Sequence, residues 1–148
     1  MDCQGCEFIP DLYYDQAFQI WVTVDANGLA TIGMTDISQS IAGNIMHIRV
    51  RRPGTRRPPG KPVATIESAK WAGPVPNFFE CTIEDANLTL LNDPSLLNKD
   101  PYGAWIARVR LTESADIALR DFVTGEIAKQ GYLARIIDEN IECRRLED

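Results

Sequence analysis

The sequence has little of what enzymes, membrane proteins and secreted proteins need. It contains one histidine, His47, so a Ser-His-Asp or Cys-His catalytic pair has no plausible context. No glycine-rich loop precedes a Lys-Ser or Lys-Thr pair, which argues against a phosphate-binding loop. No apolar run is long enough to span a bilayer, and the N-terminus lacks the basic and apolar regions of a secretory signal. We therefore expect a cytoplasmic protein without membrane insertion.

The composition indicates one globular domain. Hydrophobic residues make up 45% and charged residues 24% of the 148 residues, which are ordinary values for a folded chain. The net charge of −6 and the sequence pI near 4.8 argue against a nucleic-acid partner, since phosphate binding favours a basic surface. In a cytoplasmic chain we expect the four cysteines to be mostly reduced thiols. They are Cys3, Cys6, Cys81 and Cys143.

The first two thirds of the chain have the pattern of β-strands. Segments rich in β-branched and aromatic residues alternate with turn residues, as is typical of short paired strands. We expect strands at residues 18–24, 29–33, 44–50, 62–68, 78–83 and 104–111. Residues 25–28 predict the turn of a hairpin, because Asn-Gly tolerates positive φ. Residues 52–62, with four prolines and two glycines, predict a loop without regular structure.

Helical signals occur once within the β-rich part and again after it. Asp36 is expected to cap a short internal helix that runs through Ile41 and ends at Gly43. Ser114 is expected to cap a C-terminal helix that Gly131 interrupts, and a second short helix follows. Strands followed by helices predict an α+β fold.

A short internal sequence repeat suggests that the β-rich part of the chain consists of two similar halves. Residues 30–33 (Ala-Thr-Ile-Gly) recur as residues 64–67 (Ala-Thr-Ile-Glu), at an offset of 34 residues. In the second half the repeat leads into a turn that ends in Lys70. A carrier protein needs its lysine on a turn, where the ε-amine protrudes for acylation and the attached arm moves without obstruction. An exposed turn lysine without a function has the same appearance, so the spacing alone leaves both interpretations open.

A family resemblance favours the carrier. Matching segments occur in order within residues 13–125, and they are Ala30-Thr31-Ile32-Gly33-Met34-Thr35-Asp36, Gly43-Asn44-Ile45, Pro53-Gly54-Thr55, Glu67-Ser68-Ala69-Lys70, Gly73-Pro74-Val75, Asn92-Asp93-Pro94 and Leu97-Asn98-Lys99-Asp100-Pro101-Tyr102-Gly103. In them the chain resembles the H protein of the glycine cleavage system, a lipoyl carrier. The resemblance implies a non-catalytic protein with lipoate amide-linked to Lys70, in a turn that also contains Glu67 and Ser68. Biotin carriers share the architecture, but their lysine typically lies between two methionines.

The resemblance also implies the fold and its boundaries. We expect a lipoyl-type (H-protein-like) pseudo-symmetric β-sandwich hybrid with a short internal helix and C-terminal helices. Residues 1–148 are then a single lipoyl-carrier domain, with a β-rich core at 13–111 and a helical segment at 114–143.

Some residues depart from the family pattern. Asp15-Gln16-Ala17-Phe18 replaces Asp-His-x-Trp, Trp71 is bulky beside the lysine, and Cys3 and Cys6 are additional. These departures resemble the lipoate-binding proteins of sulfur oxidation, which act with a heterodisulfide-reductase-like complex. We expect that pathway, with glycine cleavage as the alternative. The implied partners are lipoate–protein ligase, dihydrolipoamide dehydrogenase, and either the heterodisulfide-reductase-like complex or the glycine cleavage enzymes.

Two further features have open interpretations. The Cys3-x-x-Cys6 motif is a candidate redox dithiol, half of a zinc site completed by Cys81, Cys143 or His47, or a sequence without function. A redox dithiol would make the chain a thiol-redox protein instead of a carrier. Residues 49–61 hold six basic residues and no acidic one, which indicates either a docking surface or a solvated loop. No other metal site is expected.

Overall fold

A computed structural model describes residues 4–147 of the chain. In these residues the strands are β1 (Tyr13–Tyr14), β2 (Ile20–Val24), β3 (Leu29–Met34), β4 (Ile45–Val50), β5 (Arg56–Arg57), β6 (Ala64–Ser68), β7 (Ala72–Val75), β8 (Cys81–Ala86) and β9 (Ala107–Leu111). The helices are α1 (Asp36–Ala42), α2 (Leu88–Asn92), α3 (Leu96–Lys99), α4 (Ala115–Ala118) and α5 (Gly125–Asp138).

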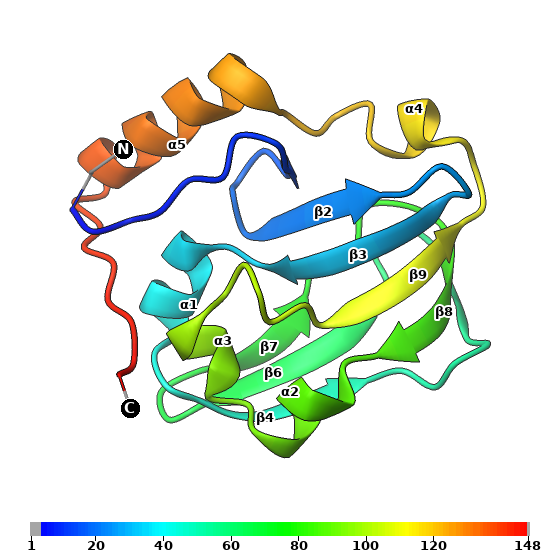
Figure 1. Ribbon diagram of the computed structural model, residues 1–148, viewed down its shortest axis with the longest axis horizontal. Coiled ribbons are helices and arrows are strands. Elements are labelled where there is room, and N and C mark those ends of the chain that lie inside the picture. Colours follow the sequence, from blue (N-terminus) through cyan, green and yellow to red (C-terminus); the bar gives the residue numbers. More distant parts are fainter. Residues whose placement is uncertain (1–3, 148) are drawn as a thin grey trace.

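The strands form two antiparallel sheets, one behind the other in Figure 1. The larger sheet has the order β1-β2-β3-β9-β8-β5, and the smaller has the order β4-β6-β7. The two strands that carry the sequence repeat, β3 and β6, lie in opposite sheets. Each buries its alanine and isoleucine and leaves the threonine between them less buried. This arrangement agrees with the expected pseudo-symmetric β-sandwich.

The main core lies between the two sheets. Along β6 and β9 buried and more exposed residues alternate, which is the pattern of strands with one face on the core. The residues that meet in the core include Ile20, Val22, Ile32, Ile48, Ile66, Val75, Ile83, Val109 and Leu111. Because both sheets contribute, neither can keep its apolar face out of water without the other.

The six expected strands are present with shifted ends, and β1, β5 and β7 were not expected. The segment predicted at 78–83 starts later, as β8, because Phe79 already packs in the core beyond the end of the sheet. Two residues of the predicted loop, Arg56 and Arg57, pair with β8 as β5. The helices α2 and α3 were not expected. Their first residues follow Asn87, which caps α2 through Leu90 N–H, and Ser95.

The internal helix α1 is capped one residue earlier than expected. Thr35, and not Asp36, is the N-cap, because its Oγ1 accepts a hydrogen bond from Ser38 N–H at 3.2 Å. Asp36 is instead in the first turn. Gly43 ends the helix with a φ of +80°, as expected.

The C-terminal helix α5 runs through Gly131 without interruption. A Cβ at Gly131 would lie 2.7 Å from the ring of Phe18, so the glycine allows α5 to approach the start of β2 closely. The break in helical structure falls earlier, where Val123 forms an isolated β-bridge with Tyr14. Within residues 4–147 no helix is long and apolar enough to cross a membrane.

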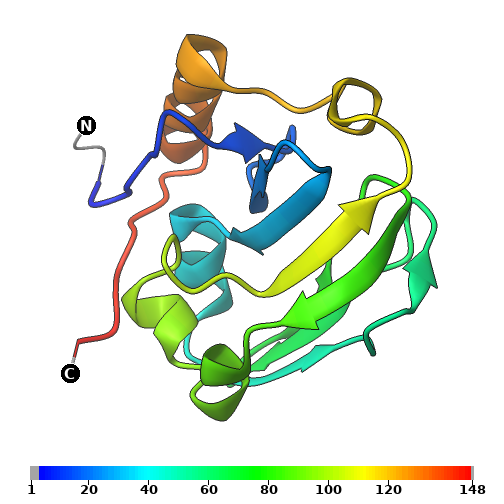
Figure 2. The same cartoon turned by 45° about the vertical axis from the view of Figure 1, so that its right-hand side comes forward.

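A second apolar cluster fixes the two chain ends. It lies between α5, α1, the first strands and the terminal segments, and it contains Cys6, Tyr14, Phe18, Trp21, Ile37, Ala128, Tyr132, Ile136, Ile141 and Cys143. The N-terminal and C-terminal segments therefore run beside each other on one side of the molecule (Figure 2). Cys143 N–H donates to Gln4 C=O at 2.9 Å, and this contact brings the two terminal cysteines together.

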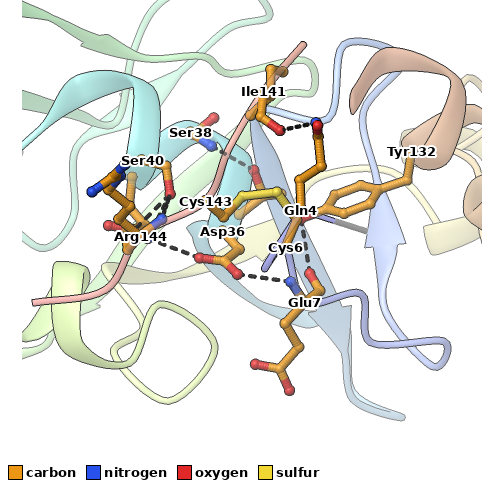
Figure 3. The surroundings of a disulfide bond; sticks show 12 residues. Gln4, Cys6, Glu7, Asp36, Ser38, Ser40, Tyr132, Ile141, Cys143 and Arg144 are labelled. Atoms are coloured by element: carbon orange, nitrogen blue, oxygen red, sulfur yellow. Dashed lines mark hydrogen bonds between the residues drawn. A yellow bond between two sulfur atoms is a disulfide. The ribbon is translucent and has the colours of Figure 1, made fainter. Parts of the chain in front are cut away.

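Cys6 and Cys143 form a disulfide, which corrects two expectations (Figure 3). Of the three described cysteines, two are oxidised, and Cys6 is bonded to Cys143 and so is not a free partner for Cys3, which lies outside the described residues. The physical reason is the fold, because it places the α-carbons of these two residues 4.8 Å apart across a sequence separation of 137. Cys81 is a free thiol in the core.

Asp15 organises the turn that precedes β2, in which Phe18 has a positive φ. The carboxylate is 2% exposed and accepts hydrogen bonds from the backbone N–H groups of Gln19 and Ile20, both at 2.8 Å, and of Ala17. Burial raises the pKa of Asp15, although these donors oppose the shift. The resulting turn holds Phe18 at a φ of +55° and places its ring against α5.

Candidate functional site

Lys70 lies in the tight turn that connects β6 and β7. Ser68 N–H donates to Trp71 C=O at 2.7 Å, which closes the turn, and Ser68 Oγ accepts from Lys70 N–H at 3.3 Å. Ser68 is buried, whereas Ala69, Lys70 and Trp71 are exposed. The turn therefore presents a primary amine outward from a short, hydrogen-bonded support.

The stem of Lys70 passes over the end of α1. A Cβ at Gly43 would lie 3.0 Å from Lys70 Cε and 3.7 Å from Nζ, so the absence of a side chain at Gly43 leaves room for the lysine. The next residue supports the turn directly, since Asn44 C=O accepts from Ala69 N–H at 3.3 Å. The segment from Gly43 to Ile45 is thus the base on which the lysine turn rests.

The side chain of Asn98 holds the Gly43–Ile45 segment in place through hydrogen bonds. Its Oδ1 accepts from Ile45 N–H at 2.8 Å, and its Nδ2 donates to Gly43 C=O at 2.8 Å and to Gln39 Oε1 at 3.0 Å. The side chain is 3% exposed. Sequence analysis placed Asn98 in a matching segment but gave it no role, because only the fold brings residue 98 to the end of α1.

The residues that follow Asn98 in the matching segment, Pro101 and Tyr102, hold neighbouring parts of the chain in place. Tyr102 Oη donates to Glu7 C=O at 2.7 Å and accepts from Asp36 N–H at 3.3 Å, so it links the N-terminal segment to α1. Pro101 C=O accepts from the indole N–H of Trp21 at 3.1 Å. The Pro-Tyr-Gly segment therefore acts on the site through α1 and does not contact the lysine.

An apolar pocket of about 410 Å³ opens beside Lys70. Its floor is formed by the buried side chains of Ile20, Met34, Ile66 and Val75, and its walls by Ile41 of α1 and Trp71 of the turn. Trp71 covers Gly73, where a Cβ would lie 2.5 Å from the indole ring. The bulky residue beside the lysine is thus a wall of the pocket.

The polar groups at the pocket are few. Gln19, Ser38, Lys70 and Arg135 line it, and none of its lining residues within 4–147 is acidic. Arg135 donates through Nε to Glu139 at 2.9 Å and through a terminal nitrogen to Ala17 C=O. The site thus combines an acylatable amine with an adjacent apolar pocket, which fits a covalently attached arm with an apolar chain such as lipoate.

The other predicted site residues lie in different places. Glu67 is exposed on β6, opposite Ala72 on one side and His47 on the other. Cys6 is in the disulfide and Cys3 is outside the described residues, so Cys6 is not available for the proposed dithiol or zinc site. Burial raises the pKa of the Cys81 thiol to about 11, which makes it a poor nucleophile.

Replacing Glu67 with alanine is expected to slow lipoylation of Lys70 and to leave the fold intact. Within residues 4–147 the Glu67 carboxylate has no hydrogen bond or ion pair, so its loss should change the free energy of unfolding by less than about 0.5 kcal/mol. Thermal melting and a ligase time course measure the two effects, with Glu113→Ala, which removes an exposed carboxylate outside this face, as the control. A large fall in melting temperature with normal lipoylation would contradict this assignment.

Comparison with known proteins identifies the family. The sequence profile of the glycine cleavage H-protein family matches residues 12–131. Glycine cleavage system H protein 3 of Aquifex aeolicus is 43% identical over 145 residues, which cover 96% of this chain and 90% of that protein. H protein 2 of the same organism is 44% identical over 141 residues, covering 95% and 87%.

A solved structure supports the fold. The crystal structure of a glycine cleavage system H protein from Mycobacterium marinum superimposes with a TM-score of 0.71 at 21% identity, covering 84% of this chain and 99% of that one. Neither the family nor these relatives is named for sulfur oxidation. The chain therefore belongs to the glycine cleavage H-protein family, whose members are non-catalytic carriers with lipoate covalently attached to a lysine.

Proposed function

We propose that lipoate is amide-linked to Lys70 and that the chain carries the aminomethyl group in glycine cleavage. The observation that carries this proposal is the exposed Lys70 amine beside the 410 Å³ apolar pocket, in a chain of this family. Glu67 and Ser68 are proposed to present the lysine. Ser68 does so by closing the turn, and Glu67 as an exposed carboxylate for the modifying enzyme.

The residues around Lys70 have separate tasks in this function. The turn and Gly43 direct the amine outward, so that its surroundings do not block acylation. The apolar floor of Ile20, Met34, Ile66 and Val75 takes up the chain of the arm and excludes water from its end. Each buried CH₂ contributes about 0.8 kcal/mol, which is enough to favour a docked arm and still allow its release. When bound, lipoate supplies a dithiolane that opens to take up the carried group.

Reconstitution tests the pathway. The lipoylated protein is mixed with the other glycine cleavage enzymes, and release of CO₂ from glycine is measured against carrier concentration. We expect efficient, saturable decarboxylation, and the protein without lipoate serves as the control. Absence of turnover with a carrier that is lipoylated at Lys70 would overturn the pathway but not the attachment site.

The partners follow from the same proposal. Lipoate–protein ligase attaches the arm, the glycine cleavage enzymes load and unload it, and dihydrolipoamide dehydrogenase reoxidises the dithiol. The single domain of residues 1–148 and its cytoplasmic location remain predictions of the sequence.

A second candidate is sulfur oxidation with a heterodisulfide-reductase-like complex. The observation in its favour is the charge at the pocket, where Arg135 is present and none of the described lining residues is acidic. A protonated amine on the arm finds no acidic residue in the described lining, whereas an anionic sulfur group would compete with Glu139 for the guanidinium. Failure in glycine decarboxylation together with turnover by the sulfur-oxidising complex would favour this candidate.

A further inference from the structure

The basic segment of residues 49–61 leaves three arginines without partners. Arg56 pairs with Glu80 at 3.0 Å, and Arg57 donates to Pro62 C=O at 2.9 Å. Arg49, Arg51 and Arg52, which we call the basic strip, are exposed and make no ion pair with any residue in 4–147. Their positive charge is therefore not neutralised within the described chain.

The rest of the chain has the opposite charge. The segment contains six of the 15 basic residues, so nine remain against 21 acidic ones and give the remainder a net charge of −12. A polyanion such as nucleic acid or an anionic membrane would meet this negative surface around a small basic area. A protein surface with a local acidic area matches the strip better, because only the facing parts must be complementary.

The basic strip lies on the strand that leads away from the lysine turn. Strand β4 pairs with β6 so that Ile45 is opposite Ser68 and Arg49 is opposite Thr65, and the strip continues beyond the end of β4. In Figure 1, β4 lies at the edge of the smaller sheet and runs away from the end of α1. A partner that reaches the Lys70 turn from this side therefore faces the strip.

Two shallow hollows along this face share one residue of the strip. One, of about 350 Å³, is lined by His47, Arg49, Glu67 and Pro74. The other, of about 380 Å³, is lined by Arg49, Arg51, Arg52 and Thr65. Because Arg49 lines both, the hollows adjoin, and they connect Glu67 beside the turn with the arginines.

We propose that the basic strip docks the enzyme that acylates Lys70, through an acidic rim around the acyl-transfer site of that enzyme. This inference rests on the proposed attachment of lipoate at Lys70. The acylating enzyme must bring its transfer site to the ε-amine itself, so its surface has to lie against the turn, and a surface that extends from there along β4 meets the strip. Enzymes that act at the far end of the arm do not need such close contact.

The test is lipoylation kinetics with a purified lipoate–protein ligase, ATP and lipoate. The strip variant is Arg49→Gln with Arg51→Gln and Arg52→Gln. The charge-matched control is Arg120→Gln with Lys129→Gln and Arg144→Gln, which removes the same charge from the turn after α4, from α5 and from the C-terminal segment. A second control replaces the three strip arginines with lysine, which retains the charge. All variants change surface residues, and thermal melting verifies that they fold.

For the strip variant we expect kcat/KM to fall roughly tenfold at an ionic strength of about 0.01 M. This fall should come from a higher KM, with kcat unchanged. At about 0.15 M the Debye length falls from about 30 Å to about 8 Å, and the difference should shrink to about twofold. The charge-matched and lysine controls should stay within about twofold of the parent throughout.

Three results would overturn parts of the argument. Equal low-salt kinetics for the strip variant and the charge-matched control would overturn the docking surface. Unchanged lipoylation together with lost binding to phosphatidylserine vesicles would assign the strip to a membrane and overturn the proposal as well. A parent protein that is not lipoylated at Lys70 would instead overturn the proposed function on which the inference rests.

Discussion

Replacing Lys70 with arginine is expected to abolish lipoylation completely and to leave the melting temperature unchanged. Arginine keeps the positive charge on an exposed turn, but it offers no amine that can be acylated. Intact mass after incubation with a ligase measures the modification, and thermal melting measures the fold.

The matched control for this variant is Lys61→Arg. Lys61 is an exposed loop lysine, so its replacement should leave the lipoyl adduct at full yield. Peptide mapping that found the arm on Lys61, Lys99 or Lys129 would show that the attachment site is wrong. A large loss of stability would instead indicate that the Lys70 stem supports the end of α1.

Replacing Asn98 with alanine is expected to have the largest effect on stability. It leaves Ile45 N–H and Gly43 C=O without their partner in a buried environment, together with the Gln39 side chain. An unsatisfied buried group costs about 1–3 kcal/mol, so we expect a loss of about 3 kcal/mol and a fall in melting temperature of roughly 10 °C. Lipoylation should also slow, because these residues form the base of the Lys70 turn.

Thermal and denaturant unfolding measure this loss, and Asn92→Ala provides the control. Asn92 is exposed at the end of α2, and its replacement should change stability by less than about 0.5 kcal/mol. An Asn98 variant that melts with the parent would show that water or a neighbouring group replaces the amide. The role of Asn98 as the support of the turn would then be wrong.

Local sequence signals were sufficient for six of the nine described strands and for a turn that contains Lys70. The alternation along β6 and β9 and the repeat between β3 and β6 depend on nearest neighbours and on one core face, and both can be recognised in a single sequence. The turn at Lys70 was predictable for the same reason. Strand β7, the other half of this hairpin, was not predicted, because its Gly73 and Pro74 are unfavourable in a strand.

Contacts between distant residues were not predictable. Gly131 breaks a helix by its propensity, but here it continues α5 because Phe18, far away in the sequence, packs against it. Asn98 has no visible role until the fold brings it to Gly43 and Ile45. The same applies to the disulfide, since 137 residues separate Cys6 from Cys143 in sequence and only the fold brings them together.

The departures from the family pattern have structural explanations. Trp71 packs on Gly73 and forms a wall of the pocket, Phe18 packs against Gly131 of α5, and Cys6 is joined to Cys143. These departures favoured a sulfur-oxidation carrier when only the sequence was considered. Because Trp71, Phe18 and Cys6 each have a role in packing or covalent structure, these three departures are no evidence for a particular cargo.

The link between Cys6 and Cys143 makes nearly the whole chain a covalent ring with two short tails. A single cut in the exposed Pro-rich loop at residues 52–62 would open this ring without dividing the molecule. The two halves of the sandwich, and with them Lys70 and its pocket, would still belong to one covalent species. Protease damage at that loop would thus leave the carrier in one piece for as long as the disulfide is intact.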